Sequence, residues 1–138
     1  MIGIVVVTHG NLSEQLVATA SLIMGGTSDI KAVTFAASES LEDLRTKTAA
    51  AANEFLSDGC LILTDIMGGS ATNVSIEVMK SRTDVEVVTG VNLPMLVEAI
   101  SARTDCTLKE LSARIQDSGT RSIINLKDFF EKRAARKK

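Results

Sequence analysis

His9 and Asp65 are the residues of this sequence whose types and positions first suggest chemistry. His9 is the only histidine and follows the apolar run IVVV at 4–7, and Asp65 follows a second apolar run, CLILT at 60–64. If the two side chains meet, the carboxylate holds the Nδ1 proton of the imidazole and leaves the Nε2 lone pair facing solvent. A histidine kept in that state can act as a nucleophile.

Gly68, Gly69 and Ser70 follow Asp65 closely and precede an expected helix. Paired glycines let backbone N–H groups approach an anion, and the N-terminus of a helix favours negative charge. The Ser70 hydroxyl adds one more donor. These residues predict that His9 attacks a phosphoryl group whose oxygens the backbone binds, while Asp65 stabilises the imidazole as it becomes cationic.

Each of these features also has a plain structural explanation. A single histidine after a strand is often an ordinary polar residue, a pair of glycines also serves simple turns, and aspartate is common where a helix or turn begins. The functional interpretation depends on all of them meeting at the ends of two neighbouring strands. The residue pattern does not itself establish that strand order.

Buried-type strands alternating with helices are the elements that must position these residues. Short apolar or β-branched runs predict strands at 2–7, 30–35, 60–64, 85–89 and 121–126. The helix signals are the caps Asn11 (with Glu14), Ser40 and Thr107 (with Glu110), Pro94 in a first turn, and the stops Gly25–Gly26, Asp58–Gly59 and Gly119. The alternation predicts an α/β fold. We expect a single-domain three-layer sandwich, with a four-stranded parallel sheet of order 2-1-3-4 and helices on both faces.

The carboxyl ends of the predicted strands are where a ligand is expected. Parallel α/β sheets bind ligands there, at the point where the strand order reverses. In the flavodoxin-like order the first and third strands are neighbours at that point, ~4.8 Å apart. His9 and Asp65 would then lie within hydrogen-bonding distance of each other.

The size and composition of the chain restrict its class. Its 138 residues fit one domain, 45% of them are hydrophobic, and no apolar run approaches the ~20 residues that span a bilayer. The first apolar run lacks the basic start and the length of a signal peptide, so we expect a cytoplasmic protein. In that compartment Cys60 and Cys106 are expected to be thiols rather than a disulfide.

Several kinds of site are disfavoured. One histidine without a Cys pair or a carboxylate cluster supplies too few metal ligands, and no Gly-rich nucleotide motif follows the first strand, so we expect no metal and no cofactor. A net charge of −2 and the absence of Trp and Tyr argue against nucleic-acid binding. We interpret the basic segment KRAARKK at 132–138 as a solvated helix end in preference to a linker remnant or a membrane-surface contact.

Three segments of the chain resemble a known family, the mannose-type enzyme IIA of the bacterial phosphotransferase system. They are IVVVTHG at 4–10, LTDIMGGSATN at 63–73 and GVNLPMLVEAI at 90–100, in the family's order and spacing, and EQLVATASLIMG at 14–25 also fits. The resemblance extends to roughly residue 125. We therefore expect an enzyme IIA domain over 1–126 and a basic C-terminal helix or tail over 127–138.

The resemblance implies that His9 is phosphorylated at Nε2. The donor would be the phosphocarrier HPr, and the acceptor a mannose-type enzyme IIB that membrane components couple to sugar uptake. Asp65 matches the carboxylate partner of the histidine, and Gly68, Gly69 and Ser70 match the phosphoryl-binding loop. The protein would contact the membrane only indirectly, through transporter components.

The resemblance also implies the surroundings of the site and an assembly. Thr8, Met67 and Asn92 are expected to wall the site. Family members form homodimers that exchange a late antiparallel strand, which would lie here at 121–126.

Two departures from the family pattern stand out. Members often carry Pro and an aromatic residue after Gly-Gly-Ser, where this chain has Ala71 and Thr72, and we expect this to affect partner preference more than chemistry. Many members continue into a IIB domain, whereas this sequence ends after its basic segment, so we expect IIB to be a separate protein.

Two other functions fit the same residues. A hydrolase could use Ser70, His9 and Asp65 as a triad, although the G-x-S-x-G elbow is absent. A signalling module could use phosphorylated His9 to select a regulator, with no role in transport. The sequence does not specify a sugar.

Overall fold

The computed structural model describes residues 1–136 and contains one parallel sheet. Its strands are β1 (Gly3–Val7), β2 (Ile30–Val33), β3 (Cys60–Thr64) and β4 (Val85–Thr89). They lie in the order β2-β1-β3-β4, which confirms the predicted order. Every residue of β1 and β3 is buried, as expected for central strands covered on both faces.

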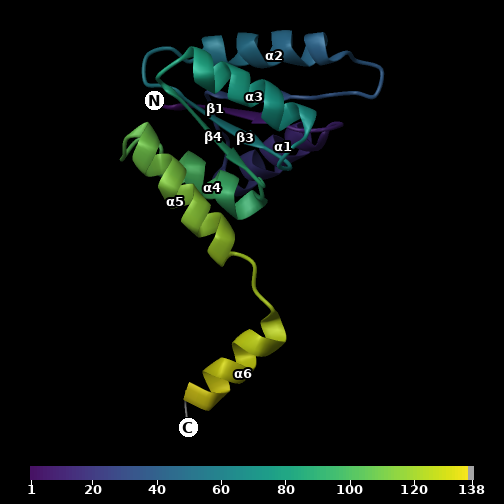
Figure 1. Ribbon diagram of the computed structural model, residues 1–138. Coiled ribbons are helices and arrows are strands. Elements are labelled where there is room, and N and C mark those ends of the chain that lie inside the picture. The colour runs from purple at the N-terminus through teal and green to yellow at the C-terminus, as the bar shows by residue number, and fades with distance from the viewer. Residues whose placement is uncertain (137–138) are drawn as a thin grey trace.

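Helices cover both faces of the sheet, so the predicted three-layer α/β sandwich is confirmed (Figure 1). They are α1 (Leu12–Met24), α2 (Leu41–Asn53), α3 (Ser70–Ser81), α4 (Leu93–Ala102), α5 (Leu108–Arg121) and α6 (Leu126–Arg136). Alternate residues of β1 point to opposite faces. Ile4 and Val6 pack in a core with α1, α4 and α5, whereas Val5 and Val7 pack in a second core with α2 and α3.

Side-chain caps begin several of the helices. Ser40 caps α2 and Thr107 caps α5, in capping boxes with Asp43 and Glu110 respectively. The prediction that Asn11 caps α1 is wrong, because its side chain makes no capping hydrogen bond. The buried Thr8 hydroxyl takes that role and accepts a hydrogen bond of 2.7 Å from the Ser13 N–H.

Two predicted helix ends are also wrong. Helix α2 ends at Asn53, well before Asp58, and α5 continues through Gly119 to Arg121. Gly119 is buried against α4, and a Cβ there would lie 3.3 Å from the Met95 Cβ. The glycine therefore serves the close packing of two helices and does not stop one.

The strand predicted at 121–126 is not formed in the part of the chain that the structure describes. Arg121 ends α5 and Leu126 begins α6, with only 122–125 between them. Ile123, which is 80% exposed, has no neighbouring strand to pair with in this single chain. The exchange of this segment in a dimer stays a prediction.

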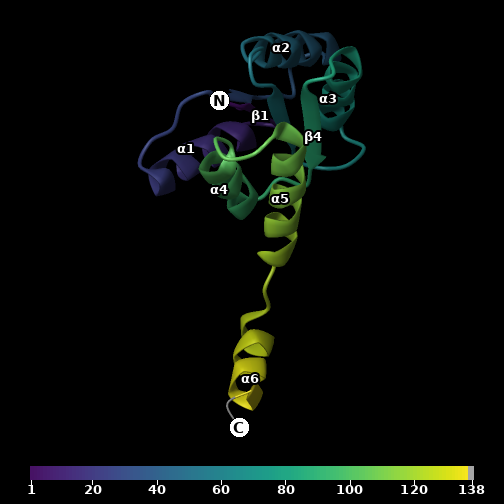
Figure 2. The same cartoon turned by 90° about the vertical axis from the view of Figure 1, so that its left-hand side faces the viewer.

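Helix α6 projects away from the rest of the molecule (Figure 1), and the view in Figure 2 shows the same separation. None of its residues is buried. The helix predicted for the basic C-terminal segment is therefore present over 126–136, and Lys137 and Lys138 lie outside the described residues. Within the described residues, every helix is too short or too polar to cross a membrane.

Candidate functional site

His9 and Asp65 lie side by side at the carboxyl edge of the sheet. Strands β1 and β3 are paired, with Val7 opposite Thr64, so the residues that follow each strand emerge together. The Nδ1 atom of His9 is 2.8 Å from Asp65 Oδ2. The backbone N–H of His9 donates to the same oxygen at 2.9 Å, so one carboxylate oxygen holds both the main chain and the ring of the histidine.

The state of Asp65 determines the state of the ring. Its second oxygen accepts a hydrogen bond of 3.0 Å from the Ile66 N–H. Burial raises the pKa of the Asp65 carboxyl, but the hydrogen bonds from the His9 backbone, the His9 ring and Ile66 together outweigh burial and hold that pKa below its usual range. An ionised Asp65 accepts a hydrogen bond from Nδ1–H, so the proton stays on Nδ1 and the lone pair of the His9 ring is on Nε2.

The two side chains differ in exposure in a way that suits a nucleophile. The Asp65 side chain is 13% exposed, whereas the His9 side chain is 48% exposed. The carboxylate is thus largely shielded from solvent, where its hydrogen bonds are strong, and about half of the His9 side chain is open to solvent.

The glycine loop approaches the reacting edge of the ring. A Cβ on Gly69 would lie 2.9 Å from His9 Cε1 and 3.7 Å from Nε2, so only glycine leaves the ring its present place. Gly68 has a positive φ of 79°, which brings the chain round to the start of α3. The loop therefore sets the N-terminus of α3 beside Nε2.

The N-terminus of α3 is open to an anion. Gly69 is the N-cap residue and carries no capping side chain, and the first turn contains no acidic residue. The first N–H groups of a helix have no acceptor within the helix, and they carry the positive end of its dipole. Those of Ser70 and Ala71 are thus available where oxygens of a group bound to Nε2 would lie.

Thr72 holds this loop in place through a cluster of hydroxyl groups that the sequence analysis missed. Thr72 Oγ1 donates to the Ile66 carbonyl at 2.6 Å and lies 2.7 Å from Thr64 Oγ1 and 3.3 Å from Thr89 Oγ1. A hydroxyl has one proton and two lone pairs, so Thr64 and Thr89 donate to Thr72. The cluster joins the loop to the ends of β3 and β4, and threonines closing two strands were its signal in the sequence.

The burial of Ala71 and Thr72 bears on one expectation. Ala71 is fully buried and Thr72 is 3% exposed. Their side chains are therefore not placed for direct contact with a partner, and the expected effect on partner preference stays a prediction. The departure from the family pattern at these positions changes how the loop is supported.

The residues expected to wall the site have different roles. Thr8 is fully buried, and its hydroxyl donates to the His9 carbonyl at 3.1 Å, so it supports the histidine from below. Asn92 caps α4 by accepting from the Met95 N–H and donates to the Gly119 carbonyl, so its polar atoms are engaged with α4 and α5. Met67 is the member of the set that lies at the surface of the loop, 79% exposed.

Phe35 is a neighbour of His9 that the sequence analysis did not include. Gly10 and Phe35 exchange two backbone hydrogen bonds of 2.9 and 3.2 Å just beyond the paired ends of β1 and β2. The centroids of the Phe35 and His9 rings are 6.2 Å apart, in a tilted arrangement. Leu12, which follows His9 in the chain, and Ile66 and Met67, which follow Asp65, are also exposed, and these three side chains form an apolar border beside the two residues.

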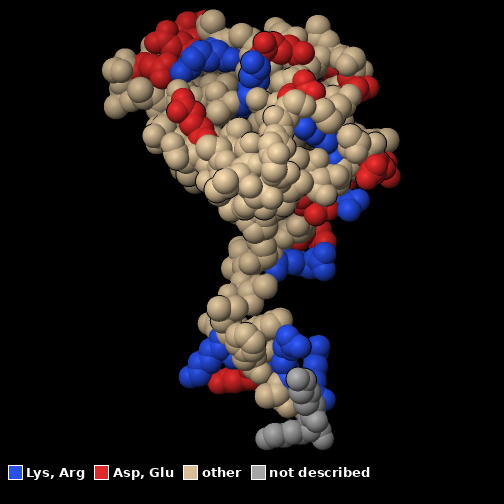
Figure 3. Space-filling model, turned by 180° about the vertical axis from the view of Figure 1, so that it is seen from behind, with Lys and Arg blue, Asp and Glu red and all other residues tan. Residues whose placement is uncertain are grey.

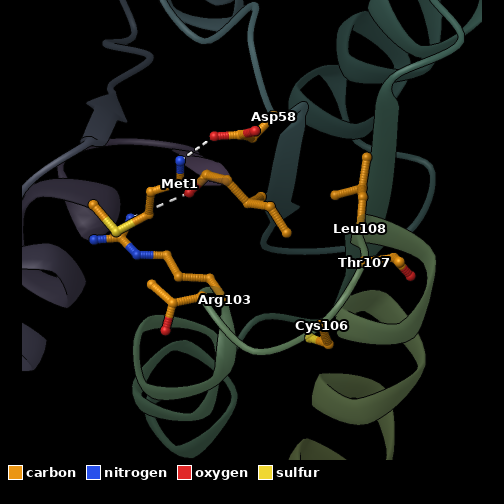
Figure 4. A pocket seen from close by; sticks show the side chains of 8 residues that line it. Met1, Asp58, Arg103, Cys106, Thr107 and Leu108 are labelled. Carbon is orange, nitrogen blue, oxygen red and sulfur yellow. Dashed lines mark hydrogen bonds and ion pairs between the residues drawn. The ribbon is translucent and has the colours of Figure 1, made fainter.

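A second candidate site lies at the opposite end of the sheet. A cavity of about 470 Å³ lies there. Met1, Asp58 and Arg103 border it (Figure 4). The buried Arg103 guanidinium donates to the carbonyls of Ile2, Ser28 and Asp29, and the N-terminal amine pairs with Asp58. These polar groups hold chain segments together, and the cavity contains no pair of groups arranged for proton or group transfer.

Cys60 does not provide a nucleophile for either site, whereas the Cys106 thiol borders the second cavity and donates to the Ala102 carbonyl at 3.4 Å. Cys60 is buried in the core, and burial raises the pKa of its thiol to about 12. Such a thiol is protonated at neutral pH and inert. Within the described residues, no three His, Cys, Asp or Glu side chains gather as a metal site would require.

Comparison with known proteins assigns the chain as a whole to a family. The family model described as "PTS system fructose IIA component" matches residues 3–116. The chain is 36% identical over 128 residues to the PTS system mannose-specific EIIAB component of Escherichia coli (strain K12), which covers 91% of this chain and 40% of that protein. The chain thus spans less than half the length of that relative. It is 27% identical over 133 residues to the PTS system fructose-specific EIIA component of Bacillus subtilis (strain 168), covering 96% and 91% of the two chains.

Solved structures give the same result. The phosphotransferase system component EIIA from Streptococcus agalactiae superposes with a TM-score of 0.87 at 30% identity, covering 93% of this chain and 99% of that one. The mannose/sorbose specific IIA subunit from Enterococcus faecalis superposes with a TM-score of 0.82 at 27% identity, covering 90% and 93%.

Proposed function

The chain belongs to the mannose-type enzyme IIA family of the bacterial phosphotransferase system, and we propose that His9 takes a phosphoryl group from the phosphocarrier HPr and passes it to an enzyme IIB protein. A role in phosphotransfer within that system follows from the family. The proposal adds the residue, the donor and the acceptor, and it assigns the chain to sugar uptake or its regulation in the cytoplasm.

The 2.8 Å contact between His9 Nδ1 and Asp65 Oδ2 is the observation that carries the proposal. It keeps the proton on Nδ1, so Nε2 attacks the phosphorus of the phosphorylated donor with its lone pair. A bond from Nε2 to phosphorus forms as the bond from phosphorus to the donor nitrogen breaks, and the donor nitrogen keeps that electron pair. Asp65 balances the positive charge that develops on the His9 ring.

The loop before α3 supports the same step from the other side. The transferred group carries negative charge on its oxygens, and the free N–H groups at the start of α3 are donors for them. Transfer to enzyme IIB is the reverse step with a new acceptor, since a nucleophile of that protein attacks the same phosphorus. The apolar border of Leu12, Ile66 and Met67 suits contact with a protein surface, and the half-exposed ring suits a protein-bound donor.

A signalling role uses the same chemistry and differs only in the partner that follows. The triad hypothesis is weaker, because no hydrogen bond found among the described residues joins Ser70 to His9. We therefore keep the signalling alternative as an outcome of the test below and do not develop the hydrolase further.

Intact-mass measurement after incubation with phosphoenolpyruvate, enzyme I and HPr tests the proposal. We expect one acid-labile phosphoryl group on the wild-type chain and none on His9→Ala. Addition of a mannose-type enzyme IIB should then remove the group from the chain and label the acceptor. If HPr is shown to be phosphorylated and the wild-type chain gains no phosphoryl group, the proposed donor is wrong. If the phosphoryl group stays on the chain when IIB is present, and a regulator binds only one phosphorylation state of the chain, the signalling role replaces transport.

A further inference from the structure

Thr72 lies in the first turn of α3 with its side chain in the interior of the molecule. It is 3% exposed, and Thr64 at the end of β3 is fully buried. Lys, Arg, Asp and Glu side chains lie at the surface of the body on the face that Figure 3 shows. The Thr72 hydroxyl is instead shielded from water, where a hydrogen bond is strong and a lost partner is costly.

The chemistry of the neighbouring groups fixes the direction of each hydrogen bond at Thr72. A carbonyl oxygen can only accept, so the single hydroxyl proton of Thr72 is directed to the Ile66 carbonyl at 2.6 Å. The hydroxyls of Thr64, at 2.7 Å, and Thr89, at 3.3 Å, then donate to Thr72. Its proton and both its lone pairs are thus engaged, which holds the side chain in one rotamer.

Ile66 is the residue through which Thr72 reaches the phosphotransfer site. Its carbonyl accepts from Thr72, and its N–H donates to Asp65 Oδ1 at 3.0 Å. The other carboxylate oxygen of Asp65 lies 2.8 Å from His9 Nδ1. Ile66 is therefore held on both sides, between the carboxylate that orients the ring and the threonine that belongs to α3.

The loop between Ile66 and α3 has little support of its own. Met67 is 79% exposed, and a Cβ on Gly68 would meet no atom within 4 Å. A Cβ on Gly69 would lie 3.3 Å from Ile66 Cγ1 and 2.9 Å from His9 Cε1, so the Ile66 side chain and the ring both border the glycine. The position of the loop thus depends on how firmly Ile66 is held.

The reaction needs the start of α3 and the His9 ring at a fixed separation. Asp65 fixes the ring, Thr72 fixes the helix, and Ile66 joins the two. A phosphoryl group on Nε2 gains stabilisation from N–H donors that are already in place when it arrives, and a small misplacement of such donors is costly in rate.

We propose that Thr72 is a positioning residue for phosphoryl transfer, an inference that rests on the proposed function. Its hydroxyl holds the start of α3 where the free N–H groups of Ser70 and Ala71 receive the oxygens of the group on His9. Because Thr72 is buried, it acts through Ile66 and not by contact with the donor protein. Loss of the hydroxyl should therefore slow the transfer step and leave donor binding unchanged.

Rapid-quench measurement of phosphoryl uptake at a series of phosphorylated HPr concentrations tests this. Thr72→Val keeps the shape of the side chain and removes the hydroxyl, and we expect the maximal rate to fall about tenfold while the half-saturating HPr concentration changes less than about twofold. Thr72→Ser keeps the hydroxyl and should restore the maximal rate to within about threefold of the wild type. Thr89→Val removes the longest of the three hydrogen bonds and should give a rate between those of the wild type and Thr72→Val.

Thr48→Val is the matched control. Thr48 is also a fully buried threonine, on α2, and its hydroxyl has no hydrogen-bond partner among the described residues. The change removes a hydroxyl from the interior without breaking a hydrogen bond, so the rate should equal that of the wild type. Circular dichroism identifies any unfolded variant, and if Thr72→Val does not fold, Thr72→Ser and Thr89→Val still provide the comparison with Thr48→Val.

Four outcomes overturn the inference while the wild type is phosphorylated. Thr72→Val is as fast as the wild type, Thr72→Ser is as slow as Thr72→Val, Thr48→Val slows uptake as much as Thr72→Val, or the whole loss appears in the half-saturating HPr concentration. Each of these leaves the proposed function intact. If the wild type gains no phosphoryl group from phosphorylated HPr, the proposed function is wrong and this inference is wrong with it.

Discussion

The two ends of the sheet use buried charge in opposite ways. At the carboxyl end, Asp65 is shielded and directs its hydrogen bonds to His9, whose ring stays half exposed with Nε2 open. At the amino end, Arg103 is 4% exposed and donates to three backbone carbonyls. The partner of Asp65 is thus a half-exposed side chain, whereas the partners of Arg103 are backbone carbonyls that it ties together, and for this reason we propose a reaction at the carboxyl end only.

Asp65→Asn should have the largest effect on the carboxyl end. The amide is neutral, so it neither fixes the proton on Nδ1 nor balances charge on the ring, and we expect phosphoryl uptake to slow by roughly 100-fold or more. Rapid-quench measurement of transfer from phosphorylated HPr checks this. Asp117→Asn, which removes an exposed carboxylate paired with Arg121 on α5, is the matched control and should leave the rate unchanged. Equal rates for Asp65→Asn and the wild type would mean that the carboxylate only positions the chain.

Arg103→Met should affect stability and leave the chemistry alone. The change removes the donor to the Ile2 and Ser28 carbonyls and one of two donors to the Asp29 carbonyl, which keeps the Ile4 N–H, and we expect the free energy of unfolding to fall by about 3 kcal/mol. Urea denaturation measures this, with Arg114→Met as the control, since that exposed pair with Glu98 should contribute within about 0.5 kcal/mol. Phosphoryl uptake well below the melting temperature should match the wild type. A large loss of rate in a folded Arg103→Met protein would show that the two ends are not separate in function.

Gly69→Ala should have a smaller effect on phosphoryl uptake than Asp65→Asn, again at the carboxyl end of the sheet. The new Cβ would lie 2.9 Å from His9 Cε1, so the ring must shift away from the start of α3. We expect phosphoryl uptake to slow by about tenfold with little loss of stability, because a small misplacement of a reacting group is costly in rate. The exposed residue Asn73 in the first turn of α3 provides the control Asn73→Ala. An unchanged rate for Gly69→Ala would show that phosphoryl uptake does not depend on the close approach of the loop to the His9 ring.

The arrangement of the sheet could be predicted because it depends on features that local sequence carries. Buried-type strands alternating with helices define a parallel sheet, and in the order found, β1 and β3 must present His9 and Asp65 together. The same reasoning reached the glycine loop, since Gly69 follows Asp65 before a helix. Phe35 was missed because the strand predicted at 30–35 included it, whereas β2 ends at Val33 and leaves Phe35 beside His9. The Thr72 cluster was missed because residue types alone do not show that a helix hydroxyl turns inward to meet the threonines that close β3 and β4.

The wrong predictions came from residues whose local preference was overridden by packing. Asn11 is a good cap by type, but the buried hydroxyl of Thr8 already accepts the Ser13 N–H. Gly119 is a common helix stop, but here it lets α5 approach Met95. The β-branched pair Ile123–Ile124 suggested a strand, and a strand is stable only with a neighbour to pair with.

The open position of His9 has a consequence for how long a phosphoryl group could stay there. A His9 side chain that is 48% exposed also meets water when no partner is bound. The N–H groups at the start of α3 would steady the group, but they would not exclude an attacking water. Hydrolysis therefore competes with transfer to the acceptor. The phosphorylated fraction of the chain would then follow the current rates of phosphorylation by the donor and of removal by the acceptor and water, and it would relax quickly when either rate changes.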